Sequence, residues 1–201
     1  MSEHYYEHHP TSTSNPTFFN ATLNTFTLTF QTDDGVFSKR QVDYGSKVLL
    51  EQFRQPTVMG NLLDLGCGYG PIGITLAKQF PERSIYMVDI NERAVNLAKE
   101  NVELNDVENA TVLWSDALSE VKGERFASVV TNPPFRAGKQ VVHQMMEDSY
   151  HVLVPGGELW VVVQKKQGAP SLKKKLEAIF SEVETVKKDK GYYVLLAKRF
   201  D

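Results

Sequence analysis

From residue 61 onward, short apolar runs alternate with longer segments whose apolar residues recur every three or four positions. The short runs are rich in β-branched and aromatic side chains, which is typical of buried strands. They are NLLDL, SIYMVD, ATVLW, RFASVVT and ELWVVVQ. The segments between them have helical periodicity, and they include PIGITLAKQF, ERAVNLAKENVELN, AGKQVVHQMMEDSYHVLV and SLKKKLEAIF. Strands that alternate with helices in this way predict a doubly wound, mostly parallel α/β sheet.

The last part of the chain departs from this alternation. Two strand-like runs, VETVKK and GYYVLLAKR, are joined by the short turn DKG. They predict a hairpin that places one antiparallel strand in the otherwise parallel sheet. The long helix before ELWVVVQ is expected to end at Pro155, Gly156 and Gly157, because this run cannot continue a helix.

The first part of the chain predicts an extension that packs on the main domain. FTLTF alternates apolar and polar residues like a strand, TDDGVFSK is typical of a turn, and Asp43 is a plausible N-cap for a helix that reaches Phe53. We therefore assign residues 18–56 to a β/α extension and residues 57–201 to the main domain.

Residues 1–17 are polar and are expected to form a flexible, solvated tail. The tail contains His4, His8 and His9, but no cysteine or carboxylate follows them at the spacing of metal ligands. The sequence therefore predicts no metal site.

Composition narrows the class of protein. A chain of 201 residues with 41% hydrophobic and 23% charged residues is expected to form one globular core. It contains no apolar stretch of roughly 18 residues and no signal-peptide pattern. Its single cysteine, Cys67, excludes an internal disulfide. We expect a cytoplasmic protein without a membrane partner; its oligomeric state does not follow from the sequence.

The charge is unevenly distributed along the chain. Residues 1–160 carry 12 Lys and Arg against 20 Asp and Glu, whereas residues 161–201 carry 10 against 5. The basic residues are densest in QKKQGAPSLKKK. A basic end on an acidic protein is compatible with a phosphate-rich partner, but charge alone favours a solvated helix face.

Polar residues stand where four of the predicted strands end: Asp64, Asp89, Asp116 and Asn132. Ligands of doubly wound sheets bind beyond the carboxyl ends of strands, so these residues are the first candidates for a site. Three carboxylates favour a ligand that carries positive charge and hydrogen-bond donors. Asp89 and Asp116, each taken singly, are equally compatible with a cap or a turn.

The first of these strands leads into a glycine-rich loop, LGCGYGPIG. Gly68, Gly70 and Gly73 match the literal dinucleotide pattern GxGxxG, which leaves a dehydrogenase as a rival interpretation. Such a site holds a pyrophosphate with backbone amides at the start of the helix. Pro71 lacks one of these amides, and the acidic strand end would repel the phosphates. The loop therefore favours another adenosine cofactor.

The stretch VVTNPPF ends a predicted strand with an amide, two prolines and an aromatic residue. Proline restricts the residue before it and donates no hydrogen bond, so this segment is stiff and rich in acceptors. The side-chain oxygen of Asn132 and the carbonyl of Pro133 are placed to accept from one NH2 group, and Phe135 to stack on a flat substrate. A structural turn with a core phenylalanine is the alternative.

At this point the chain resembles the class I S-adenosylmethionine-dependent methyltransferases, in DLGCGYG for the cofactor loop and in VDIN for the ribose-binding strand end. The resemblance covers the chain from about residue 60 onward and implies a Rossmann-like methyltransferase sheet. By this resemblance S-adenosylmethionine is the cofactor, and its binding residues are Asp64, Gly66, Cys67, Gly68, Gly70, Asp89, Ile90, Asp116, Ala117 and Asn132.

NPPF matches the [DN]PP[YFW] motif of amino-group methyltransferases, which implies catalytic roles for Asn132, Pro133 and Phe135. The stretches GVFSKRQVDYGSKVLL and FRAGK are similar to the rRNA guanine N2-methyltransferases of the RsmC type. That resemblance implies small-subunit rRNA as partner and substrate. The substrate-binding residues that it implies are Phe37, Pro134, Phe135, Arg136 and Lys139.

Several alternatives stay open from the sequence. Release-factor glutamine methyltransferases have a related NPPY loop, and DNA adenine methyltransferases have similar loops with an added recognition domain. A non-catalytic RNA-binding or assembly module with a retained cofactor pocket is a further possibility.

Overall fold

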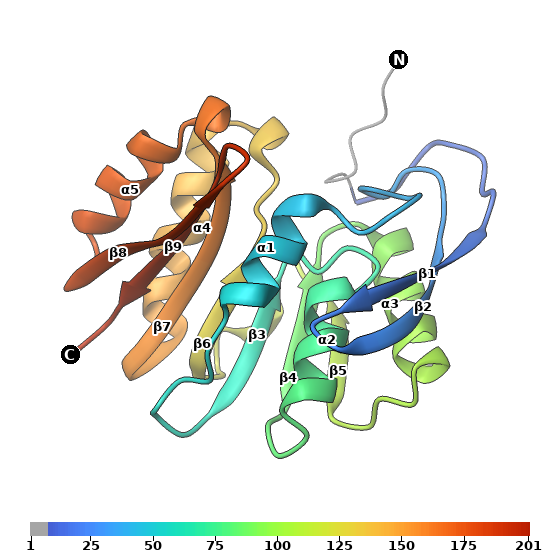
Figure 1. The fold of residues 1–201 in the computed structure, drawn as a ribbon, viewed down its shortest axis with the longest axis horizontal. Helices are drawn as coiled ribbons and strands as arrows, with labels where there is room; N and C mark the ends of the chain where they lie inside the picture. The colour runs from blue at the N-terminus through green and yellow to red at the C-terminus, as the bar shows by residue number, and fades with distance from the viewer. Residues whose placement is uncertain (1–7) are drawn as a thin grey trace.

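A computed structural model of the chain describes residues 8–201 and shows an α/β sheet of seven strands with a separate two-stranded hairpin (Figure 1). The strands are β1 (Thr17–Leu23), β2 (Phe26–Thr32), β3 (Asn61–Leu65), β4 (Ile85–Asp89), β5 (Ala110–Trp114), β6 (Phe126–Thr131), β7 (Leu153–Gln164), β8 (Glu182–Asp189) and β9 (Tyr192–Lys198). The helices are α1 (Tyr44–Gln52), α2 (Pro71–Gln79), α3 (Glu92–Leu104), α4 (Lys139–Val152) and α5 (Ala169–Glu177), with short 3-10 helices η1 (Ser119–Val121), η2 (Phe135–Ala137) and η3 (Lys165–Gln167).

The large sheet has the strand order β5-β4-β3-β6-β7-β9-β8. All neighbours from β5 to β7 pair in parallel, whereas β9 is antiparallel to both β7 and β8. This confirms the doubly wound sheet and the single antiparallel strand contributed by the C-terminal hairpin. Between β3 and β6 the strand order reverses direction, so the carboxyl ends of these two strands form the switch point at which such sheets bind ligands.

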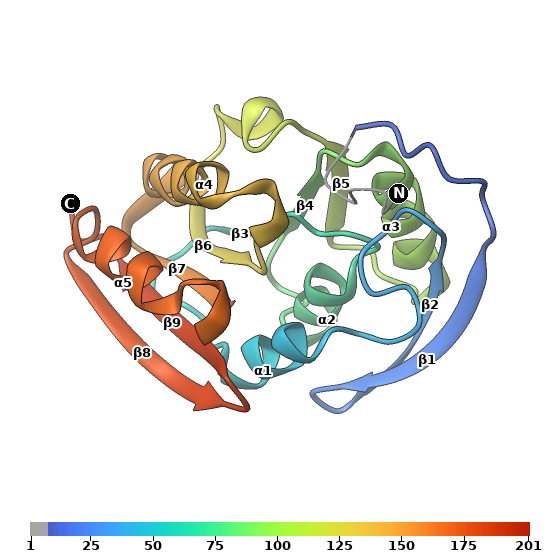
Figure 2. The ribbon, with the colours of Figure 1, turned by 90° about the horizontal axis from the view of Figure 1, so that it is seen from above.

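Helices cover both faces of the sheet. Figure 2 shows α4 and α5 on one side, and α1, α2 and α3 on the other. Because successive side chains of a strand point to opposite faces, neighbouring residues of β3 enter different cores: Leu62 packs with the α1–α3 layer and Leu63 with the α4–α5 layer. None of the helices over residues 8–201 combines the length and the apolar character that crossing a bilayer requires.

The hairpin of β1 and β2 is attached to the main domain through α3. Asn101 and Asn105 lie one helical turn apart, and each exchanges two hydrogen bonds with the backbone of β2. Asn101 pairs with Gln31 at 2.8 and 2.9 Å, and Asn105 with Thr29 at 3.0 and 2.9 Å. The two side chains thus satisfy the free edge of β2. The strand β1 was not predicted, because its apolar residues do not alternate cleanly.

Part of the tail expected over residues 1–17 is bonded to the main domain, although most of its described residues are exposed. Residues 1–7, including His4, lie outside the described residues. From His8 onward the chain follows α3: Glu92 N donates to His8 O at 3.0 Å, and Arg93 donates to Ser12 O at 2.8 Å. The side chain of Asp33 accepts from Asn15 N at 2.5 Å. Polar composition did not reveal these bonds, because their partners are distant in the sequence.

The expected end of the fourth helix is wrong. α4 ends at Val152, and the Pro155–Gly157 run lies inside β7. Gly156 N donates to Arg199 O, and Arg199 N donates to Gly157 O at 3.0 Å, so the run is paired with the chain that follows β9. The glycine at 156 has φ 80°, which lets the strand bend locally instead of ending.

Candidate functional site

A cavity of about 580 Å³ opens at the carboxyl ends of β3, β4, β6 and β7. Its size is within the range of small-molecule sites. The loop of residues 34–43 forms one wall and is fixed to the main domain. Asn91 donates to Gly35 O at 2.9 Å, Arg93 donates to Asp34 O at 2.7 Å, and the Tyr69 hydroxyl donates to Ser38 O at 3.2 Å. The extension is therefore part of the site and not only a scaffold.

The floor of the cavity is the glycine loop after β3. Gly66 and Gly68 have φ values of 75° and 55°, which glycine adopts without strain. Gly66 N and Cys67 N both donate to Val88 O at 2.9 Å, and Gly68 N donates to Asp89 Oδ2 at 2.8 Å. A Cβ atom at residue 66 or 68 would meet no protein atom within 4 Å. The backbone of the loop thus faces the open cavity, where a ligand can approach it closely.

Asp89 lies at the end of β4 beside this loop. Its two carboxylate oxygens accept from Gly68 N and from Asn91 N, both at 2.8 Å. Burial raises the pKa of Asp89 to about 6, against the lowering effect of these backbone bonds. Each carboxylate oxygen keeps further lone pairs beyond these bonds, and Asp89 lines the cavity. The residue is therefore suited to accept hydrogen bonds from a pair of ligand hydroxyls.

Further acceptors line the part of the cavity around Asp89, which we call the acidic half. Ile90 and the pair Asp116–Ala117, which follow β4 and β5, contribute to its wall, and Asp116 is exposed. Trp114 Nε1 donates to Ile90 O at 2.7 Å and fixes the turn after β4. The structure brings these predicted residues together in one cavity, because their strands are neighbours in the sheet.

Two residues of the predicted cofactor set do not line the cavity. Gly70 has φ 108° and is the N-cap of α2, where an added Cβ atom would meet the side chains of Ile74 and Met87. Asp64 is fully buried under the loop, where its Oδ2 atom accepts from Gly73 N at 2.8 Å. Its Oδ1 atom has no hydrogen-bond partner among the described residues, and burial raises the pKa of Asp64 to about 7. Asp64 therefore shapes the loop from below.

Cys67 lines the cavity floor between two glycines and is nearly buried. Burial, followed by the charges of Asp64 and Asp89, raises the pKa of its thiol well above the ordinary value. A thiol that stays protonated is a poor nucleophile. Cys67 therefore contributes to the cavity floor in its neutral thiol form.

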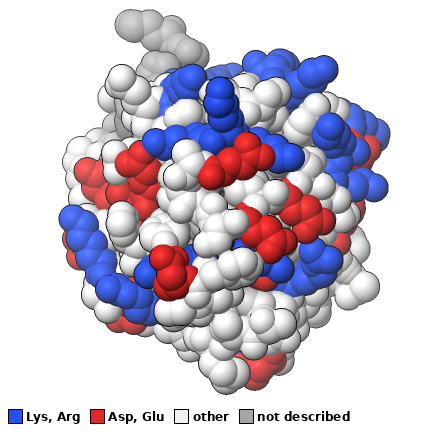
Figure 3. Space-filling view, turned by 90° about the vertical axis from the view of Figure 1, so that its left-hand side faces the viewer, with Lys and Arg blue, Asp and Glu red and all other residues white. Residues whose placement is uncertain are grey.

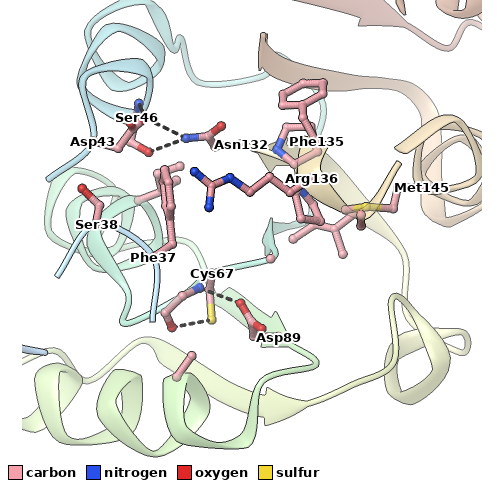
Figure 4. Close-up of a pocket in the computed structure, with 18 of the residues that line it drawn as sticks. Phe37, Ser38, Asp43, Ser46, Cys67, Asp89, Asn132, Phe135, Arg136 and Met145 are labelled. Carbon is pink, nitrogen blue, oxygen red and sulfur yellow. Dashed lines mark hydrogen bonds between the residues drawn. The ribbon is translucent and has the colours of Figure 1, made fainter. Parts of the chain in front are cut away.

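Asn132, directly after β6, is held by the first turn of α1. Its Nδ2 atom donates to Asp43 Oδ2 at 2.9 Å and to Ser46 Oγ at 3.1 Å (Figure 4). A carboxylate only accepts hydrogen bonds, so the nitrogen of the amide must face Asp43. The Oδ1 atom then points away from α1. No residue within the described part of the chain donates a hydrogen bond to it. A fixed acceptor is thereby presented to a ligand.

The rest of the NPPF loop contributes walls and one further acceptor. Pro133 O accepts from Phe135 N at 3.0 Å, which engages one of its two lone pairs, a bond that the sequence did not predict. Phe135 begins η2, lines the cavity and also packs against the α4–α5 core. Phe37, from the 34–43 loop, is 41% exposed and lines the cavity as well. The cavity thus has aromatic side chains from two separate segments.

Cationic side chains lie at the mouth of the other half of the cavity, the half around Asn132. Arg136 extends from η2 toward Phe37 and Asn132 (Figure 4), and Lys166 of η3 also lines the cavity. Pro134 lines it too, whereas Lys139, at the start of α4, does not. Of the predicted substrate residues, the structure therefore brings Phe37, Pro134, Phe135 and Arg136 together.

The basic run predicted from sequence is divided by the fold. Lys165 and Lys166 are exposed on η3, which is joined to the β8–β9 turn by a bond from Lys165 N to Gly191 O at 2.8 Å. Lys190 of that turn is also exposed. In contrast, Lys175 of α5 forms an ion pair with Glu147. Lys and Arg side chains gather toward the top of the face that α5 and the C-terminal hairpin of β8 and β9 form (Figure 3).

Several residues of the site were not predicted from the sequence. Asp43 was recognised only as a helix cap. Lys166 belongs to the basic run noted from the sequence, but the sequence did not place it at the cavity. The others are Ser46, Tyr69, Gln164 and Tyr192. Gln164 Nε2 donates to the Tyr192 hydroxyl at 2.7 Å, which closes the wall between β7 and β9. No local motif marks these residues, because each belongs to an ordinary helix or strand and reaches the cavity only through the packing of distant elements.

Among residues 8–201, one group has potential metal ligands close together: His8, His9 and Glu92. The sequence did not reveal the carboxylate, which comes from α3. His9 Nδ1 lies 3.0 Å from the Glu92 carboxylate, while the rings of His8 and His9 are stacked with centroids 3.9 Å apart. Lone pairs of imidazole lie in the ring plane, so stacked rings direct them side by side and not toward one ion.

Comparisons with known proteins agree with this arrangement. The model of the methyltransferase small domain family matches residues 27–196. The uncharacterized protein YbxB of Bacillus subtilis is 52% identical over 200 residues, which cover 99% of this chain and 100% of that protein.

Two further relatives have a stated activity. The ribosomal RNA small subunit methyltransferase C of Hahella chejuensis is 41% identical over 149 residues, which cover 72% of this chain and 41% of that protein. The solved structure of the T. thermophilus 16S rRNA N2 methyltransferase (RsmC), in complex with AdoMet and guanosine, superimposes with a TM-score of 0.81 at 28% identity. That match covers 92% of this chain and 50% of the other. The chain thus spans about half or less of the length of these two proteins.

Proposed function

This chain belongs to the methyltransferase small domain family, and from this premise we propose that it methylates the exocyclic amino group of guanine, at N2, in small-subunit rRNA. Its RsmC-like class I fold and its family make it an S-adenosylmethionine-dependent methyltransferase. The proposal concerns the acceptor of the methyl group and the residues that hold it.

The acidic half of the cavity suits S-adenosylmethionine. Bound S-adenosylmethionine supplies an electrophilic methyl carbon on a positively charged sulfur. Asp89 would accept from the two ribose hydroxyls, and the exposed loop backbone at Gly66 and Gly68 would lie against the methionine part. Asp116 and Ala117 would border the adenine. These carboxylate acceptors carry negative charge, which fits a cationic cofactor better than a dinucleotide.

The observation that carries the proposal is the fixed orientation of Asn132. Both donors of its amide nitrogen are used by Asp43 and Ser46, so its Oδ1 atom is presented as an acceptor. An aromatic NH2 group is a weak nucleophile because its lone pair is delocalised into the ring. Accepting its hydrogens at Asn132 Oδ1 and at the second lone pair of Pro133 O favours a pyramidal nitrogen and directs the lone pair.

The chain also stabilises the charge that develops in the reaction. The amino nitrogen forms a bond to the methyl carbon while the carbon–sulfur bond breaks, and the nitrogen becomes positive. Preorganised acceptors at that nitrogen stabilise the charge without reorganisation. The methylated nitrogen then loses a proton to water, so the mechanism requires no strong general base.

The walls and mouth of this half favour a base within RNA. Phe37 and Phe135 offer aromatic faces for a flat ring, and stacking of a base is worth about 1–3 kcal/mol. Arg136 and Lys166 add positive charge at the opening, where the phosphates of an RNA strand would lie. A glutamine side chain would use the acceptors but neither the aromatic walls nor the cations.

Transfer of labelled methyl groups tests the proposal. Purified protein is incubated with labelled S-adenosylmethionine and, in separate reactions, with small-subunit rRNA, small subunits, large-subunit rRNA and a release factor. We expect label in small-subunit rRNA, recovered as N2-methylguanosine by nucleoside mass spectrometry. Label that appears only in the release factor, or only in large-subunit rRNA, would overturn the substrate proposed.

The Asn132→Ala variant serves as the matched control in each reaction. It should abolish incorporation while cofactor binding, measured by calorimetry, is retained. Cofactor binding without transfer to any acceptor would instead support a binding or assembly module.

A further inference from the structure

We propose that Asp43 is a positioning residue for methyl transfer, because its carboxylate fixes the orientation of the Asn132 amide and increases the negative charge on Asn132 Oδ1. The inference rests on the proposed function of that amide. It extends the catalytic group from the NPPF loop to the first turn of α1, a helix of the N-terminal extension.

The contact itself is specific in direction. Asn132 Nδ2 lies 2.9 Å from Asp43 Oδ2 and 3.1 Å from Ser46 Oγ (Figure 4). The same Oδ2 atom accepts from Ser46 N at 3.2 Å, as the N-cap of α1. One carboxylate oxygen therefore joins the helix start to the catalytic amide. An inverted amide would place Asn132 Oδ1 against this carboxylate, so the inverted state is electrostatically unfavourable.

The carboxylate also polarises the amide. When a charged acceptor binds the N–H side of an amide, electron density shifts toward its oxygen, and the oxygen becomes a stronger acceptor. The substrate nitrogen, which becomes positive during transfer, is then held by an oxygen that is itself bonded through the amide to a negative charge. The negative charge of Asp43 is thereby joined by one hydrogen bond to the amide whose oxygen, Asn132 Oδ1, is the neutral acceptor.

The charge of Asp43 is not neutralised locally. Over residues 8–201, no lysine, arginine or histidine forms an ion pair with Asp43. Its field reaches the cavity walls: burial and then the charge of Asp43 raise the pKa values of Tyr69 and Tyr192, both of which line the cavity. These phenols stay neutral, so Asp43 supplies the negative charge of this half.

Gly45 allows this arrangement. A Cβ atom at residue 45 would lie 2.9 Å from Asp43 Oδ2 and 2.8 Å from Tyr192 Cε1. Any larger residue would push the carboxylate or the tyrosine ring from its place. The close packing of α1 on β9 therefore depends on glycine at this position and keeps Asp43 directed at Asn132.

The test replaces Asp43 with asparagine. Asn is a good N-cap, so Asp43→Asn preserves the start of α1 while it removes the charge and the fixed direction of the bond. We expect kcat for methyl transfer to fall about 10- to 100-fold, a smaller loss than the 10²–10³ typical for removing a group in direct contact with the reacting atoms. The Kd for S-adenosylmethionine should change less than about twofold, since Asp43 lies outside the predicted cofactor half.

Two comparisons separate positioning from general stability. Asp189→Asn removes a carboxylate that accepts from Tyr44 on the same helix but does not contact Asn132, and kcat should stay at the wild-type value. In an Asn132→Ala background, Asp43→Asn should cause no further loss of kcat, because the group through which it acts is gone. An unchanged kcat in Asp43→Asn alone, or a full additional loss in the double variant, would overturn the inference.

A second measurement does not depend on turnover. In nitrogen-15 spectra, the Asn132 side-chain NH2 signals are identified by their absence in Asn132→Ala. We expect them to exchange with water at least about tenfold more slowly than exposed Asn amides, and Asp43→Asn should remove this protection. Unprotected signals in the wild type would overturn the contact, whether or not rRNA is the substrate. Failure of the proposed function would leave this result unchanged.

Discussion

The two halves of the cavity are built in different ways. The acidic half comes from a nearly continuous stretch, from the glycine loop at Gly66 to the turn after Asp89, with Asp116 from the next strand. The half around Asn132 is assembled from segments far apart in the chain: the loop and helix of residues 36–46, the NPPF loop, the end of β7 with η3, and Tyr192. The first half depends on the glycine loop and on neighbouring strands of one sheet. The second depends on how the extension and the C-terminal hairpin pack against that sheet.

This difference indicates which half of the cavity can change by substitution without affecting the other. The cofactor half uses backbone atoms of the glycine loop and carboxylates at the ends of the neighbouring strands β4 and β5. Its geometry follows from the parallel pairing of β3, β4 and β5. The substrate half depends on side chains from the extension and from the C-terminal hairpin. Changes in either segment would alter the acceptor without disturbing the cofactor. The two halves should therefore respond separately to substitution.

Asn132→Ala should have the largest effect and act on one half only. Removing the acceptor from the reacting nitrogen is expected to lower kcat about 10²- to 10³-fold. The Kd for S-adenosylmethionine should change little, because Asp89 and the glycine loop remain. Initial rates of methyl transfer measure kcat, and calorimetry measures the Kd for S-adenosylmethionine. Asn96→Ala, on an exposed site of α3, is the matched control. A comparable loss of cofactor affinity in Asn132→Ala would show that the halves are not separate.

Asp89→Asn should weaken the binding of S-adenosylmethionine in the acidic half. Charged acceptors contribute about 1.5–3 kcal/mol per hydrogen bond, so losing the charge should weaken cofactor binding roughly 10- to 100-fold. With saturating cofactor, kcat should fall much less. Calorimetry with S-adenosylmethionine checks the affinity, and Asp106→Asn, an exposed aspartate after α3, is the control.

The same residue predicts a pH dependence of binding. The raised pKa of Asp89, about 6, means that the carboxylate becomes protonated as pH falls through 6. Cofactor affinity in the wild type should therefore decrease by up to about tenfold per pH unit below 6, and Asp89→Asn should flatten this slope. A wild-type affinity that is constant from pH 5 to pH 7 would contradict the role of the ionised carboxylate.

Asp64→Asn should change the stability of the protein more than it changes cofactor binding or methyl transfer. The folded-state pKa of about 7 lies above the ordinary 3.8, so the folded protein binds this proton more tightly than the unfolded chain. The stabilising contribution is complete below the ordinary pKa and is lost as pH rises through 7. Asp64→Asn should therefore raise Tm at pH 8, and the gain should shrink at pH 5. Calorimetric scans at both pH values measure it; a gain that is larger at pH 5 would contradict the assignment.

Lys166→Ala should have the smallest effect. One phosphate contact at the mouth of the substrate half is expected to weaken RNA binding several-fold and to reduce the salt slope of log K by about one. Lys174→Ala, an exposed lysine on α5 away from the cavity, is the matched control. Filter-binding titrations at several salt concentrations decide between them. Equal effects of both variants would mean that the cations act only through total charge.

Much of the fold followed from the sequence because its elements carry local signals. The strand NLLDL, the helix ERAVNLAKENVELN and the C-terminal hairpin all form as predicted. The misplaced end of α4 has a tertiary cause, since pairing with the backbone at Arg199 draws the Pro155–Gly157 run into β7. The strand β1 was missed because its apolar residues do not alternate cleanly.

The site divides along the same line. The glycine loop, Asp89 and the NPPF segment were found from the sequence because each is a contiguous motif with its own backbone chemistry. Asp43 was seen only as a cap, since nothing local indicates that a residue 89 positions later donates to it. Asp64 was expected at the cavity, but the strand ends one residue later and turns its side chain under the loop.

The sequence by itself determined the order of strands and helices, the cofactor loop and the acceptor-rich turn, because hydrophobic periodicity, glycine and proline act over a few residues. Only the tertiary structure decided which way the Asn132 amide faces and which side chains surround it. These properties depend on distances between segments that meet when the extension, the sheet and the hairpin pack together, and such distances are absent from any local pattern.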